Sequence, residues 1–178
     1  MAKKRRKLTL AEGAGLSIIG LSAGVVSWLL ASLETALLVR LLLLLFAWFT
    51  LWFFSHDLAH HIVGELVGIK FQYYYLGRSA IRKLKMPLIP GLMSRIPVLV
   101  LKIHQDSLLR VSPRAQRLMY ASGAIVSMSL PWLIIPEGFT LGPVWGLLFL
   151  ALVLGNDLFT LYFSPKTGDL HRARMVKG

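Results

Sequence analysis

The chain contains no cysteine. This absence excludes disulfide bonds, thiolate metal ligands and cysteine nucleophiles, so a metal site here would have to use histidine or carboxylate ligands. Acidic residues are also scarce, with 8 Asp and Glu against 20 Lys and Arg, and the formal net charge is +12. No internal repeat or low-complexity linker interrupts the 178 residues. We therefore expect residues 1–178 to form a single domain.

Apolar residues are abundant and account for 56% of the chain, too much for an ordinary soluble domain. Four segments are long enough to cross a bilayer, which takes about 20 residues. The first carries no charge and is longer than the apolar core of a signal peptide, so we expect a retained helix. The predicted spans are residues 13–33, 36–67, 118–136 and 141–163. The sequence therefore predicts an all-α multi-pass membrane protein with four transmembrane helices.

Basic residues are confined to one side of this predicted topology. Every Lys and Arg except Arg40 falls within residues 3–7, 68–117 or 166–177, which four spans place on the same face. Basic loops remain cytoplasmic, so we expect both termini inside and Arg40 to reach the outer head groups. This distribution explains the positive charge through the lipid bilayer, without a nucleic-acid partner. We expect the protein in a cell membrane, and a prokaryotic one.

The basic loop at residues 68–117 contains two strand-like segments, 69–76 and 96–103, separated by prolines and glycine. In the first, strand alternation places Phe71, Tyr73 and Tyr75 on one side. The loop is either a small membrane-apposed β-hairpin or an amphipathic surface segment. Its tyrosines form either an interfacial aromatic belt or part of a sheet edge that accepts a substrate as an added strand.

Three of the five histidines lie at the inner end of the second predicted span. His56 and His60 are four residues apart, so both imidazoles project from one helix face and can converge on a metal ion. Asp57 follows the first histidine directly. The fourth span returns Asp157 and Asp169 towards the same membrane face. The alternative is a pair of interfacial histidines that hydrogen-bond to their neighbours.

Residues 56–68, His-Asp-Leu-Ala-His-His-Ile-Val-Gly-Glu-Leu-Val-Gly, resemble the H-E-x-x-H segment of the site-2 protease family of intramembrane zinc metalloproteases. Residues 120–127 are similar to the helix that follows in this family. Asn156-Asp157, Ser164-Pro165 and Gly168-Asp169 resemble its third core helix, in which asparagine and proline precede an aspartate ligand. The resemblance covers residues 41–172 and implies a three-helix core with an added N-terminal helix.

The resemblance implies a zinc ion held by His56, His60 and Asp169, with water in the fourth position. It also implies that Asp57 transfers protons and that Asn156 contacts the substrate backbone. Asp57 departs from the family pattern, which has glutamate there, and its side chain is shorter by one methylene. Asp157 and His171 remain alternatives for the third ligand.

Three further side chains are candidates for contacting and orienting the ligands: His61, Glu65 and Asp157. His61 alternatively serves packing, and Glu65 alternatively forms a salt bridge with an arginine of the basic loop. Asp157 alternatively forms a structural hydrogen bond to the first or third span.

The expected function is hydrolysis of a peptide bond in a membrane protein or peptide substrate near the cytoplasmic face. The first alternative is an inactive or weakly active relative that binds metal and acts as a membrane binding protein. A membrane di-iron oxygenase, indicated by three neighbouring histidines, is a second. A transporter with Asp157 on its pathway is a third, although the chain lacks the repeat symmetry typical of transporters.

Overall fold

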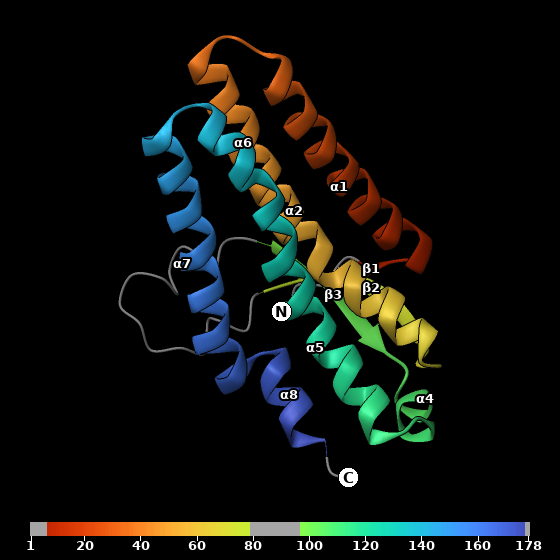
Figure 1. The fold of residues 1–178 in the computed structure, drawn as a ribbon. Coiled ribbons are helices and arrows are strands. Elements are labelled where there is room, and N and C mark those ends of the chain that lie inside the picture. Colours follow the sequence, from red (N-terminus) through yellow and green to blue (C-terminus); the bar gives the residue numbers. More distant parts are fainter. Residues whose placement is uncertain (1–6, 79–96, 177–178) are drawn as a thin grey trace, which may run out of the picture.

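The structure, a computed structural model, describes residues 7–78 and 97–176. Helices alternate with a small sheet along the chain (Figure 1). The elements are β1 (Lys7–Leu8), α1 (Leu10–Leu33), α2 (Leu37–Leu66), β2 (Phe71–Arg78), β3 (Pro97–Ile103), α4 (Gln105–Arg110), α5 (Pro113–Ser129), the 3₁₀ helix η2 (Leu130–Ile134), α6 (Ile135–Thr140), α7 (Pro143–Thr167) and α8 (Asp169–Met175). Most of the N-terminal basic run and the proposed amphipathic segment within residues 79–96 lie outside the described residues.

Four helical segments are long and apolar enough to cross a membrane: α1, α2, the continuous run Pro113–Thr140, and α7. Their outer faces carry large exposed apolar side chains, such as Ile19, Leu38 and Leu158, each about two-thirds exposed. Such surfaces are unfavourable in water and favourable against lipid tails. The predicted fold class is therefore confirmed, and the helices fit a multi-pass membrane protein.

The helix boundaries follow local sequence signals. A capping box starts α1, in which the Thr9 hydroxyl accepts from the Glu12 N–H and the Glu12 carboxylate accepts from the Thr9 N–H. The Ser112 hydroxyl caps α5, with Pro113 in the first turn. These caps satisfy backbone N–H groups that the helices leave unpaired.

The third span continues further than its prolines indicate. The predicted end of this span at residue 136 is wrong, because α6 starts at Ile135 and runs to Thr140. A proline is tolerated in the first turn of a helix, where its missing N–H would have no partner. The connection to α7 lies instead at Gly142, whose φ of +123° favours glycine.

Small residues bring α1 against α2 over most of its length. Gly20 leaves room for the Phe54 ring, and Gly24 leaves room for Thr50. The Ser27 hydroxyl donates to the Leu43 carbonyl oxygen at 2.9 Å. This close packing is typical of helix pairs in membranes. It fixes the additional N-terminal helix to the one that carries the histidines.

An ion pair joins α2 to the third span at the end of the helix bundle away from the histidines. Arg40 of α2 donates to the Glu137 carboxylate at 2.6 Å and to the Thr140 hydroxyl at 2.7 Å. The Arg40 side chain is only 18% exposed. The expectation that Arg40 extends to the outer head groups is therefore wrong, because a carboxylate lies within reach on the third span.

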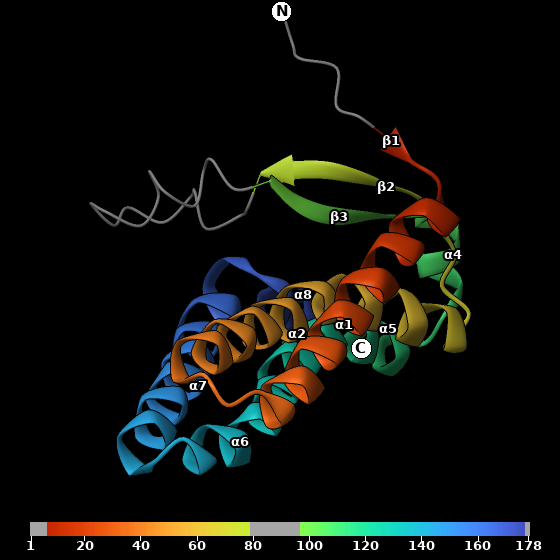
Figure 2. The same ribbon diagram turned by 90° about the horizontal axis from the view of Figure 1, so that it is seen from above.

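The sheet has the order β1-β2-β3 and is antiparallel throughout. The predicted hairpin strands are confirmed, whereas β1 was not expected. A register shift between Phe71 and Tyr73 breaks the strict alternation, so Phe71 and Tyr74 are the buried side chains. The prediction that Phe71, Tyr73 and Tyr75 share one face is wrong for this reason. Figure 2 shows the sheet as a layer beside the helices.

Candidate metal centre

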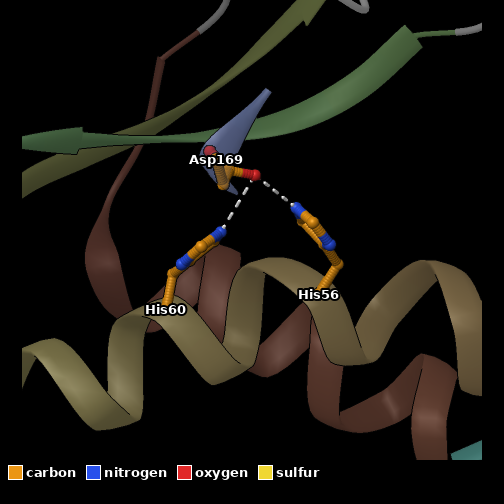
Figure 3. Close-up of side chains that lie close together, drawn as sticks. All are labelled: His56, His60 and Asp169. Atoms are coloured by element: carbon orange, nitrogen blue, oxygen red, sulfur yellow. Dashed lines mark hydrogen bonds and ion pairs between the residues drawn. The ribbon is translucent and has the colours of Figure 1, made fainter. Parts of the chain in front are cut away.

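His56 and His60 project from one face of α2 towards Asp169 (Figure 3). The Asp169 Oδ2 atom lies 3.0 Å from His56 Nε2 and 3.3 Å from His60 Nε2. One potential ligand atom from each residue lies within 4.8 Å of the other two. The predicted convergence of these three residues, from the second span and the end of the fourth, is therefore confirmed.

The end of α7 directs Asp169 to this position. Pro165 lies in the last turn, the helix stops at Thr167, and α8 starts at Asp169 after the break at Gly168. The Ser164 hydroxyl accepts from the Leu170 N–H at 3.1 Å, and the Ser164 carbonyl oxygen accepts from the Gly168 N–H at 2.9 Å. These bonds hold the connection between the two helices.

Charge favours the ionised form of Asp169. Burial alone would raise the pKa of its carboxyl group, but the imidazoles of His56 and His60 hold that pKa well below its usual range. An ionised carboxylate is the form that binds a metal cation.

The backbone of α5 determines the orientation of His60. Its Nδ1 atom lies 2.7 Å from the Met119 carbonyl oxygen, which can only accept, so Nδ1 carries the proton. The lone pair of the neutral imidazole is then on Nε2, which faces Asp169. This Nε2 is buried and lies 3.3 Å from Asp169 Oδ2, and no donor group reaches it among the described residues. A buried nitrogen lone pair without a donor is suited to a metal ion.

Two small residues of α5 complete the surroundings of the histidines. A side chain on Gly123 would collide with the His60 imidazole at Nε2. The Ser127 hydroxyl lies 3.2 Å from His56 Nδ1. Neither role was predicted, although the spacing of four places both residues on one helix face. A run of small residues at 121–124 was the available sign of close packing.

Two of the three separations between the ligand atoms are close to those in a metal site. In a tetrahedral zinc site with bonds of about 2.0–2.1 Å, ligand atoms lie roughly 3.3 Å apart. The observed nitrogen-to-oxygen separations of 3.0 and 3.3 Å are close to this value. His56, His60 and Asp169 can therefore hold a metal ion, and the donor set itself does not specify which one.

The other acidic candidate for the third ligand has a different partner. Asp157 accepts a hydrogen bond of 2.9 Å from the Trp132 indole N–H, which joins the fourth span to the third. His171 is exposed on α8. Neither belongs to the group of possible metal ligands in residues 7–78 and 97–176. Asp157 therefore forms a hydrogen bond to the third span, which was the structural alternative to a role as metal ligand.

Asn156 lies next to Asp157, and its Nδ2 atom is 3.4 Å from an Asp157 carboxylate oxygen. At about 1.5 Å per residue, it precedes Asp169 by roughly 20 Å along the helix. The structure does not bring Asn156 to the three ligands, and its contact with substrate stays a prediction.

His61 and Glu65 connect α2 to the sheet. The His61 Nδ1 atom lies 2.9 Å from the Tyr74 hydroxyl oxygen, and Nε2 lies 3.4 Å from Glu65 Oε1. Burial raises the pKa of Tyr74, so its hydroxyl stays protonated and can donate to Nδ1. The expected pairing of Glu65 with a loop arginine is replaced by this contact. Within the described chain, neither residue bonds to His56, His60 or Asp169.

Asp57 is half-buried beside the metal-binding group. No hydrogen bond to its carboxylate occurs among residues 7–78 and 97–176, in contrast to Asp157 and Asp169. Its carboxylate directly follows His56 in the chain.

Comparisons with protein-family models, curated proteins and solved structures give no match. The functional proposal therefore depends on the geometry and chemistry of the residues described above.

Proposed function

We propose that this protein is an intramembrane zinc metalloprotease that hydrolyses a peptide bond of a membrane-embedded substrate near the cytoplasmic face. The observation that carries the proposal is the convergence of His56, His60 and Asp169, with the buried His60 Nε2 atom free of any hydrogen-bond donor. Two imidazoles and one carboxylate form a donor set typical of catalytic zinc, in which water takes the fourth position.

The two histidine ligands have separate supports. The Met119 carbonyl oxygen orients His60, and Ser127 contacts the distal nitrogen of His56. Such contacts fix imidazole orientation and strengthen metal binding. When bound, zinc would polarise the scissile carbonyl group and lower the pKa of water to about 7.

Asp57 would act as the proton-transfer residue in this reaction. Its carboxylate accepts a proton from the attacking water and delivers it to the leaving amine. The resemblance expects glutamate here, and aspartate is shorter by about 1.5 Å. The half-buried carboxylate of Asp57 has no competing hydrogen bond in the described chain, which supports this role.

The sheet would present the substrate to the site. Strand β3 is an edge strand, with β2 on one side and no strand on the other among the described residues. It packs against α2, and the strands cross behind Asp169 in Figure 3. An extended substrate segment can pair with such an edge through its backbone.

The second candidate is a non-catalytic metal-binding relative that binds a membrane partner, and Asp57 in place of glutamate favours it. The di-iron and transporter alternatives have less support. The described residues contain one group of three possible ligands. Asp157 is already bonded to Trp132.

Metal analysis and cleavage assays test the proposal together. The purified protein should contain one zinc ion per chain, and His60→Ala should remove it. In proteoliposomes with a library of single-span model peptides, Asp57→Asn should retain zinc and lose at least a hundredfold in cleavage rate. The matched variant Asp57→Glu should retain cleavage.

Equal cleavage by the wild type and Asp57→Asn would overturn the catalytic role of Asp57. Zinc binding without cleavage of any library member would support the non-catalytic relative. Two iron ions per chain would replace the zinc proposal with the di-iron one.

A further inference from the structure

A groove of about 400 Å³ lies between α5 and α8, and none of His56, His60 and Asp169 lines it. Its lining consists of Arg117, Ala121, Leu170, Ala173 and Arg174. Two arginines and three apolar residues make the groove amphipathic, and no acidic residue contributes to its lining.

The two arginines retain donors for a ligand. Arg117 is exposed and uses one guanidinium nitrogen to donate to the Val176 carbonyl oxygen at 2.9 Å. Arg174 is exposed and has no hydrogen bond or ion pair with any described residue. A guanidinium group carries five N–H donors, so both can bind phosphate oxygens.

The groove lies where transmembrane helices meet the membrane surface. Arg117 is in the second turn of α5, at the basic end of the third span, and α8 directly follows the fourth span. The lining residues Ala121 and Leu170 are half-buried. Phospholipid head groups lie at the ends of membrane-spanning helices, with their phosphates towards water and their acyl chains towards the centre of the bilayer.

We propose that this groove binds an anionic phospholipid. Its phosphate lies between Arg117 and Arg174, and its glycerol and first acyl carbons cover Ala121, Leu170 and Ala173. Basic pockets between transmembrane helices bind anionic lipid head groups by this combination of charge and apolar contact. The proposal depends on neither the metal ion nor the protease activity.

Bound lipid would also support the metal-binding group. Leu170 follows Asp169 directly, and α8 carries both residues. A lipid that bridges α5 and α8 therefore restrains the helix that presents Asp169 to histidines oriented by α5.

Lipid titration of the full chain in detergent tests this site. Dioleoyl phosphatidylglycerol is the probe, dioleoyl phosphatidylcholine is the neutral comparison, and inorganic phosphate supplies the anion alone. Native mass spectrometry should show one retained phosphatidylglycerol. The double variant Arg117→Gln/Arg174→Gln should weaken its binding by about thirtyfold, since each interfacial arginine contributes about 1 kcal/mol and the variant removes two.

The matched control is Lys102→Gln/Arg114→Gln, which removes the same charge from exposed residues outside the groove. It should change binding less than twofold. Ala173→Phe fills the groove but keeps both arginines, and it should also weaken retention of phosphatidylglycerol.

Three outcomes would overturn the proposal: equal retention of the two lipids, equal losses in the two double variants, or unchanged binding in Ala173→Phe. Inorganic phosphate that displaces the lipid at millimolar concentration would assign the groove to a soluble anion instead. Thermal unfolding of each variant in the same detergent verifies that it is folded.

Discussion

The Nδ1 atom of His60 lies 2.7 Å from the carbonyl oxygen of Met119. Through this hydrogen bond, the backbone of the third span orients a side chain of the second so that its other nitrogen faces Asp169 of α8. The group of possible metal ligands therefore depends on how closely α5 approaches α2. Substitutions at the contact between α5 and α2 should therefore change metal affinity.

Gly123→Ala should weaken metal binding by at least tenfold, because the added methyl group occupies the position of the His60 imidazole. Competition with a zinc chelator measures the change. Gly155→Ala is the matched control, since a methyl group there meets nothing within 4 Å. The control should bind metal normally and gain up to about 1 kcal/mol in helix stability. Equal affinity in the two variants would contradict the close packing at Gly123.

Ser127→Ala should lower metal affinity by about tenfold, because it removes the hydroxyl group beside His56 Nδ1. Ser129→Ala is the comparison, since among the described residues the Ser129 hydroxyl bonds only to the Ile125 carbonyl oxygen of its own helix. Isothermal titration with zinc distinguishes the two. An unaffected Ser127→Ala would show that His56 is oriented without this contact.

Asp157 and Asp169 should respond differently to the same change. Asp169→Asn should abolish zinc binding, because a charged ligand is lost. Asp157→Asn should retain the metal, because this side chain bonds to Trp132 rather than to the ligands. Trp132→Phe should destabilise the protein by about 1 kcal/mol and leave its zinc content unchanged. Zinc content and thermal unfolding in detergent measure the two effects, and loss of zinc from Asp157→Asn would reverse the assignment.

Arg40→Gln should destabilise the protein by about 3 kcal/mol, because it leaves the poorly exposed Glu137 carboxylate without its cation. The double variant Arg40→Gln/Glu137→Gln should recover part of this loss, since it removes the remaining charge. Thermal unfolding of the single and double variants gives the coupling between the residues. Independent effects of the two substitutions would rule out a stabilising pair.

The sequence predicted those features that depend on local pattern. Apolar length identified the four spans, and the spacing of His56 and His60 placed both on one helix face. The convergence of Asp169 with them followed from the number of membrane crossings and from the family resemblance. These predictions succeeded because helix periodicity and span length are properties of contiguous residues.

Features that join distant segments were not predictable in this way. The pairing of Lys7–Leu8 with β2 and the ion pair of Arg40 with Glu137 depend on packing between segments far apart in sequence. The register shift after Phe71 has no marker in the sequence, and it moved Tyr74 into the core. The Met119 contact uses a backbone carbonyl oxygen, which every residue possesses.

Asp169 lies 113 positions after His56, and two membrane spans separate them. During biosynthesis, the histidines would therefore enter the bilayer well before the carboxylate that completes their group is made. A partly inserted chain would present two imidazoles without the third ligand, and the group would close only when the chain turns at Gly168. Binding of a metal ion by all three residues would then be possible only late in maturation.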